Sequence, residues 1–256
     1  MISRIYINRD SLPPNEKEWA IIMENLSSPF ENLKFRQQQG SNYAAYADAR
    51  EYYERFDSVI GPGNWETHYD EVKFVNSRTV DFVPDPNVKD KYGKPKKAKR
   101  HEYDETLTGI KCTITIFGKS KADVGTEANT EAVKSSFSDS FKRAAVQWGP
   151  GRYIYSLGYF TSAKPRIPEE AEYIEPYDYD SRIQALKSKI LEKAESMTGT
   201  NSDGLSFKEV ATANIDEIFQ NYSETCSILQ KYRVSNYLTQ VGKNLGSNIS
   251  YGKIGE

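Results

Sequence analysis

The stretch LTGIKCTITIF, from Leu107 to Phe117, alternates between two kinds of side chain. Successive side chains of a strand point to opposite faces of a sheet, so this alternation predicts a strand with one face in the core. The core-facing set is apolar and comprises Ile110, Cys112, Ile114 and Ile116. The upstream stretch THYDEVKFV, residues 67–75, predicts a second strand.

Downstream of the strand, the residues from Glu131 to Trp148 have the periodicity of an amphipathic helix. Lys142 and Arg143 lie outside its apolar stripe, so the helix is expected to present two adjacent cations away from the core. The stripe itself comprises Val133, Phe137, Phe141, Ala145 and Trp148.

Two shorter helices are predicted before the strands. The first follows a proline pair, ends at Pro29, and has an apolar face of Trp19, Ile22, Met23 and Leu26. The second ends at Gly61, and its shared face comprises Ala49, Tyr53, Phe56 and Ile60.

Between the two strands lies the basic segment PDPNVKDKYGKPKKAKRH, residues 84–101. It holds seven Lys or Arg against two Asp, and it contains three prolines. Such a segment cannot pack in a core, and it predicts a long hairpin arm or a mobile loop.

The composition changes again at residues 163–180, which hold three prolines and six carboxylates without clear periodicity. This pattern is typical of a linker. Beyond it, Ser181 is expected to cap a helix with Ile183, Leu186, Ile190 and Met197 on one face. The predicted organisation is a main domain over residues 1–160, an acidic proline-rich linker over 161–180 and a helical C-terminal region over 181–256.

The composition of the whole chain bounds the classes of function. The 256 residues carry a net charge of −2, so any surface for nucleic acid must be local. The 18 tyrosines supply flat faces suited to a core edge, an interface or a stack of bases. The start of the chain has no apolar region of a signal peptide, and no stretch approaches 18 apolar residues, so neither export nor a membrane span is expected.

Several kinds of catalytic or metal site are poorly supported. Cys112 and Cys226 stand far apart, which predicts neither a zinc site nor a disulfide framework. His68 and His101 have no catalytic or metal-binding spacing, and surface or structural roles are expected for them.

Two further patterns bear on phosphate and metal chemistry. Gly118-Lys119-Ser120 resembles the end of a phosphate loop, but Thr113 replaces the leading glycine. Asp81 and Asp85 flank a proline loop without a third acid fixed nearby, which argues against a metal nuclease.

The remaining chemistry is charge and stacking. Three cations lie close together in the sequence, namely Lys142, Arg143 and Arg152. Four aromatic residues follow them, namely Tyr153, Tyr155, Tyr159 and Phe160. A nucleic-acid single strand needs this combination, because its phosphates require cations and its bases offer faces for aromatic contact. The alternative is a solvated helix face beside core tyrosines, and composition alone does not separate the two.

Separated blocks of the sequence resemble the Rad52 superfamily of single-strand annealing proteins. In that family an Asp-Val-Gly turn precedes a helix with Asp-Gly-Leu-Lys-Arg-Ala and a terminal aromatic-Gly; here the matching stretches are 123–125, 139–144 and 148–149. An earlier block, residues 34–65, keeps the spacing of ten residues between Arg36 and Tyr46 and ends in Gly63-Asn64-Trp65. The ending WGPGRYIYSL looks closer to the bacterial damage-response branch (DdrA-like) and to phage annealing proteins. The resemblance covers residues 12–160.

The resemblance implies an α+β fold: a small antiparallel sheet with a β-β-β-α core packed on helices, followed by the helical C-terminal unit. It assigns DNA contacts to Arg36, Tyr46, Lys142 and Arg143. A further family arginine is Val146 here, and Arg152 is expected to substitute for it. Lys119 and Lys134 fall where relatives have a second, outer DNA site. From their charge and exposure, we also expect four lysines of the basic arm to capture DNA: Lys94, Lys96, Lys97 and Lys99.

The implied function is binding of single-stranded DNA and annealing of complementary strands in recombination or repair, by a ring of protomers with a basic groove. No bond is made or broken, so neither ATP nor a metal cofactor is expected. A bacterial or phage source places the protein in the nucleoid or in the cytoplasm of an infected host. The C-terminal helices could contact the host single-strand-binding protein, a recombinase or the neighbouring protomer. A metal-dependent nuclease and a passive protector of single-strand ends remain the alternatives.

Overall fold

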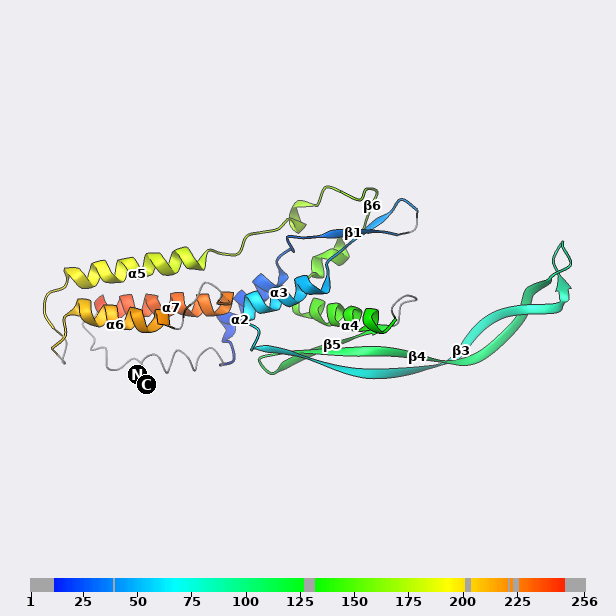
Figure 1. Ribbon diagram of the computed structural model, residues 1–256, viewed down its shortest axis with the longest axis horizontal. Helices are drawn as coiled ribbons and strands as arrows, with labels where there is room; N and C mark the ends of the chain where they lie inside the picture. Colours follow the sequence, from blue (N-terminus) through cyan, green and yellow to red (C-terminus); the bar gives the residue numbers. More distant parts are fainter. Residues whose placement is uncertain are drawn as a thin grey trace. The chain divides into compact units, whose positions relative to one another are not determined.

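The computed structural model describes residues 12–38, 40–126, 132–200, 204–220, 222 and 226–246 (Figure 1). Its helices are α2 (Glu16–Ser27), α3 (Ala49–Ile60), α4 (Ala132–Trp148), α5 (Tyr179–Ser196), α6 (Phe207–Gln220) and α7 (Ile228–Gly246). Its strands are β1 (Lys34–Gln37), β2 (Tyr43–Tyr46), β3 (Trp65–Lys89), β4 (Pro95–Ile116), β5 (Lys119–Thr126) and β6 (Tyr159–Phe160). Two short 3-10 helices are η1 (Arg152–Ser156) and η2 (Glu169–Ala171).

These elements confirm the predicted α+β class. The strands form two sheets of three, in the orders β1-β2-β6 and β3-β4-β5. The second sheet is followed directly by α4, which gives the expected β-β-β-α succession. Within the described residues, no helix is both long and apolar enough to cross a bilayer.

Tight turns make β3, β4 and β5 a meander of antiparallel strands. The turn between β3 and β4 is closed by a hydrogen bond from Asp90 N to Lys94 O, at 2.8 Å. Phe117 and Gly118 join β4 to β5 with φ of 46° and 76°. Positive φ at both central residues matches the turn that suits the right-handed twist of a hairpin. Phe117 is the one non-glycine residue with positive φ in the described chain, an uncommon conformation for a bulky side chain.

The predicted core strand is confirmed at the end of β4. Cys112, Ile114 and Ile116 are fully buried, and burial raises the pKa of the Cys112 thiol to about 11. Farther from this core, β3 and β4 continue past β5 as a two-stranded ribbon that ends at the turn over residues 90–94 (Figure 1). The basic segment is therefore the tip of a hairpin arm, one of the two forms that its composition predicts.

The helices α2 and α3 form where the sequence predicts them, with differences in which residues they bury. α2 begins with a capping box, in which Asn15 Oδ1 accepts from Glu18 N and Glu18 Oε2 accepts from Asn15 N. α3 ends at Gly61, whose φ of 87° stops the helix. α3 buries Phe56 and Ile60 as predicted, together with Tyr52 and Val59, whereas the predicted Tyr53 is 38% exposed.

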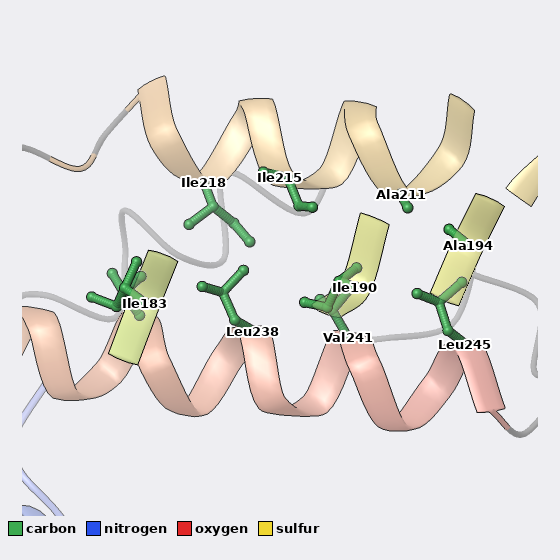
Figure 2. Close-up of a cluster of buried hydrophobic side chains, with 10 residues drawn as sticks. Ile183, Ile190, Ala194, Ala211, Ile215, Ile218, Leu238, Val241 and Leu245 are labelled. Carbon is green, nitrogen blue, oxygen red and sulfur yellow. The ribbon is translucent and has the colours of Figure 1, made fainter. Parts of the chain in front are cut away.

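The C-terminal helices α5, α6 and α7 share a core of aliphatic side chains (Figure 2). Ile183 and Ile190 of α5 contribute to it as predicted, together with residues of the other two helices such as Ile215 and Leu238. The expected cap at Ser181 is wrong. The helix begins at Tyr179, because Asp178 is the cap and its carboxylate accepts from Ser181 N at 2.9 Å.

A buried ion pair ties the last helix to the first. Arg233 of α7 donates from Nε to Glu18 Oε1 at 2.8 Å and from Nη2 to Glu18 Oε2 at 3.2 Å. The two side chains are only 7% and 12% exposed. No sequence pattern indicated this contact between residues so distant in the chain.

Close contacts group the chain into two compact units. The first comprises Met1–Glu66, Thr115–Ser120 and Ala145–Glu256, and the second comprises Thr67–Ile114 and Lys121–Ala144. The boundaries expected at residues 160 and 181 stay a prediction, to be tested on shortened chains.

Candidate nucleic-acid interface

The turn Asp123-Val124-Gly125 packs on α4 through its glycine. A Cβ atom added to Gly125 would lie 2.5 Å from Ser140 N and 2.6 Å from Ser136 O. Only a glycine permits this approach of strand to helix, and the two serines that face it are buried. The buried face of α4 therefore includes Ser136 and Ser140, which the predicted apolar stripe did not contain.

The packing of Gly125 fixes which way the Lys-Arg pair of α4 faces. Phe141 and Ala144, on either side of the pair, are buried, whereas Lys142 is half-buried and Arg143 is exposed. Arg143 donates from Nε to Asp123 Oδ1 at 3.3 Å, and the same oxygen accepts from Val124 N at 2.7 Å. The Asp-Val-Gly turn thus both seats the helix and orients one cation, a role for Asp123 that the sequence analysis did not assign.

Arg36 and Tyr46 lie in the sheet β1-β2-β6 of the first unit. β1 pairs with β2 in antiparallel register, with Arg36 opposite Ala44 and Lys34 opposite Tyr46. Residues that pair directly, and residues two apart along a strand, share one face of a sheet. The structure therefore brings Arg36 and Tyr46 together on one face, and it adds Lys34 to them.

Lys34 and Arg36 differ in their partners. Lys34 forms an ion pair with Asp48, and this hydrogen-bonded carboxylate raises the pKa of the Lys34 ammonium. Arg36 is exposed, and it makes no ion pair with a carboxylate in the described part of the chain. Tyr46 is half-buried. Arg36 is therefore the cation of this face whose charge is not already matched.

Arg152 lies at the C-terminal end of α4. Its guanidinium donates from Nε to Val146 O at 3.2 Å and from Nη2 to Gln147 O at 2.8 Å. Both carbonyls belong to the last turn of α4, and Val146 O also accepts from Gly149 N at 3.1 Å. Arg152 stays exposed, so it brings a cation to the turn where Val146 replaces the family arginine.

The residues predicted for an outer site belong to different units. Lys119 is exposed, and its Nζ lies 4.6 Å from the centroid of the Trp19 ring. Trp19 also packs edge-on against Phe117 at 6.2 Å and stacks on Trp148 at 6.3 Å. Lys134 is an exposed residue of α4 in the second unit.

The basic arm presents its cations to solvent. Lys94, Lys96 and Lys97 are exposed, and the ion pairs found among the described residues include none with these three. Lys99 lies in β4, and its side chain is outside the described residues. The Asp90 carboxylate is used by the turn, since it accepts from Tyr92 N and Lys94 N.

The carboxylates considered for a metal site have backbone partners. Asp81 Oδ1 accepts from Phe82 N, and Asp85 Oδ1 accepts from Asn87 N, both at 2.8 Å. Across the ranges that the structure covers, no three His, Cys, Asp or Glu residues gather as metal ligands would.

Comparison with known proteins gives the chain its family. Residues 18–173 match the Rad52/22 family double-strand break repair protein, and the chain belongs to this family. It is also similar to two proteins named single-stranded DNA-binding protein DdrA. The one from Deinococcus deserti is 42% identical over 53 residues, which are 20% of this chain and 26% of that protein.

The DdrA protein from Deinococcus radiodurans is 30% identical over 115 residues, which are 44% of this chain and 40% of that protein. The matches thus span less than half of either curated relative. The family assignment agrees with the resemblance that the Asp-Val-Gly and Lys-Arg blocks carry.

Proposed function

We propose that this protein binds single-stranded DNA and anneals complementary strands during recombination or double-strand-break repair. The observation that carries the proposal is the close packing of Gly125 on α4. This packing directs Lys142 and Arg143 away from the core. Membership of the Rad52/22 family and similarity to single-stranded DNA-binding proteins support the same function.

The cations would act by holding phosphates. The ion pair of Arg143 with Asp123 is exposed, so it contributes little stability and a phosphate can replace the carboxylate. Within the described residues, Arg36 forms no ion pair with a carboxylate. Cations that hold the backbone leave the bases of the strand accessible to a complement, which annealing requires.

Annealing forms base pairs without covalent chemistry, so we infer that the protein is not an enzyme and needs neither ATP nor metal. We further infer a ring of protomers, in keeping with the family, that works in the bacterial nucleoid or the cytoplasm of a phage-infected cell. The division into an annealing domain over residues 1–160, a linker and a helical region over 181–256 belongs to the same proposal. The partners proposed for the helical region are the host single-strand-binding protein and a recombinase.

The arm is proposed to speed the encounter with the second strand or a duplex. Exposed cations at the tip of a long hairpin attract DNA from solution, and this steering falls steeply with salt. Lys119 and Lys134 are proposed as contacts of the outer site.

The function is tested by mixing two complementary labelled oligonucleotides with the purified protein, with and without ATP and magnesium. An annealer yields full-length duplex faster than the spontaneous reaction under every condition. A nuclease would shorten the labelled strands when magnesium is present. A passive end protector would bind single strands but leave the rate of duplex formation unchanged. Negative-stain images with and without single-stranded DNA test the ring.

A further inference from the structure

One row of residues crosses the sheet β1-β2-β6 and ends in an exposed tyrosine. Arg36 of β1 lies opposite Ala44 of β2, and Ala44 lies opposite Tyr159 of β6. Directly opposed residues of antiparallel strands have their side chains on the same face. Arg36, Ala44 and Tyr159 therefore share a face, with the smallest side chain in the middle.

The opposite face of the sheet confirms this alternation. Phe35 and Phe160, which neighbour Arg36 and Tyr159 in sequence, meet with their ring centroids 5.4 Å apart. Their contact places both phenylalanines on one side of the sheet. Arg36 and Tyr159 consequently project from the other side.

The middle of the row carries only the methyl side chain of Ala44. Neighbouring strands lie about 4.8 Å apart, so the backbones of Arg36 and Tyr159, two strands apart, are separated by about 10 Å. A stacked base occupies roughly 3.4 Å on each side of its plane to the next flat group. The space above Ala44 therefore fits one base between a guanidinium plane and a phenol ring.

Both walls of this space are available to a ligand. Tyr159 is 72% exposed, and Arg36 is also exposed. Among the described residues, neither side chain takes part in a ring contact or an ion pair. A large apolar ring held in solvent by a strand, beside an unmatched cation, is typical of surfaces that stack bases.

We propose that Arg36, Ala44 and Tyr159 form a base-binding slot, in which one base of a DNA single strand stacks on the Tyr159 ring over Ala44, with the Arg36 guanidinium on its other side. This inference rests on the proposed binding of single-stranded DNA and adds a site to it. Sequence reasoning named Tyr159 only among interleaved aromatic residues, since the pairing of a two-residue strand is not readable from the sequence.

The test uses the full chain and a thymidine oligonucleotide with a single 2-aminopurine, whose fluorescence falls when it stacks. Tyr159→Leu, which keeps bulk but removes the aromatic face, should weaken binding about 5- to 100-fold and restore the fluorescence of the bound strand. The salt dependence of binding should not change, since no charge is removed. Tyr159→Phe should bind like the wild type.

Ala44→Leu fills the slot without altering either wall, and it should weaken binding in the same way, whereas Ala44→Ser should not. Tyr173→Leu is the control, because Tyr173 is 42% exposed and lies outside the paired row. Circular dichroism and thermal unfolding establish that each variant is folded.

The outcomes separate the slot from the function on which it rests. Wild-type affinity and quenching in folded Tyr159→Leu and Ala44→Leu, with weakened binding by Lys142→Ala/Arg143→Ala, would overturn the slot alone. Failure of the wild-type protein to bind the oligonucleotide would overturn the proposed function and the slot together.

Discussion

The two three-stranded sheets of this chain differ in what stabilises them. The sheet β3-β4-β5 buries Cys112, Ile114 and Ile116 at the end of β4 and lets Gly125 touch the backbone of α4. No residue of β1, β2 or β6 is fully buried. The sheet β3-β4-β5, the buried sheet, therefore holds the fold together, and the sheet β1-β2-β6, the open sheet, holds side chains out to solvent. Substitutions at the buried end of the sheet β3-β4-β5, away from the basic arm, should accordingly change stability, and substitutions in the sheet β1-β2-β6 should change binding.

The largest effect on stability is expected in the unit that contains the sheet β1-β2-β6, outside that sheet. The buried pair of Glu18 and Arg233 is one source of the stability of this unit. Arg233→Met would leave the Glu18 carboxylate buried without its partner, and it should lower the free energy of unfolding by about 4 kcal/mol. Chemical denaturation measures this loss.

A double variant sharpens this result. Glu18→Gln combined with Arg233→Met removes both charges, and it should be less destabilised than the sum of the single variants. If the double variant loses as much stability as the two single variants together, the two residues do not act as a pair. The cycle also bears on the proposed domain division, because deleting the residues after Tyr179 removes Arg233.

The next largest effect is expected where the buried sheet touches α4. Gly125→Ala inserts a methyl group against the backbone of Ser136 and Ser140, and it should lower the free energy of unfolding by about 3 kcal/mol. Thermal unfolding measures the change. Gly63→Ala is the matched control, because an added Cβ there meets nothing within 4 Å, and it should stay within about 0.5 kcal/mol. Equal losses of stability at both glycines would contradict the close packing of Gly125 on α4.

The basic arm should affect the rate of annealing and leave the fold intact. Replacing Lys94, Lys96, Lys97 and Lys99 by Gln should slow annealing about 10-fold at low salt, through lost steering, and weaken single-strand binding less. Stopped-flow annealing and equilibrium binding measure the two effects. Equal loss of both would place the arm in the primary binding site. The control replaces four exposed lysines elsewhere, namely Lys17, Lys164, Lys189 and Lys208.

The smallest effect is expected from Tyr46, on the face that carries Arg36. Tyr46→Ala should weaken binding by about 1 kcal/mol through a lost stack or hydrogen bond, with no change in salt dependence. The free energy of unfolding should fall less in Tyr46→Ala than in Gly125→Ala, since Tyr46 is only half-buried. A larger loss of stability than at Gly125 would contradict the division between the two sheets.

The buried sheet was predictable because its signals are local. The alternation of Ile110, Cys112, Ile114 and Ile116 predicts the strand, and helical periodicity predicts α4 to within one residue at its start. The motif blocks placed Lys142 and Arg143 on that helix. What periodicity missed is the serine face of α4, because the close approach of Gly125 makes small polar residues the ones that are buried.

The open sheet was not predictable in the same way. Strands of four, four and two residues carry too little pattern to show their pairing, so the register that joins Arg36 to Tyr159 emerges only in three dimensions. The buried charge of Glu18 was equally hidden, since its partner lies 215 residues away. The ion pair of Asp123 with Arg143 had a signal in the motif, but the motif alone does not say which residues touch.

The most direct measurement of the central claim is the salt dependence of single-strand binding by variants of the predicted cations. In a fluorescence anisotropy titration, the slope of log K against log[salt] should become shallower by about 1.4 in Lys142→Ala/Arg143→Ala and by about 0.7 in Arg36→Ala. The control Lys17→Ala/Lys189→Ala should keep the wild-type slope. Unchanged slopes in folded Lys142→Ala/Arg143→Ala and Arg36→Ala variants would show that these cations hold no phosphates and would contradict the account.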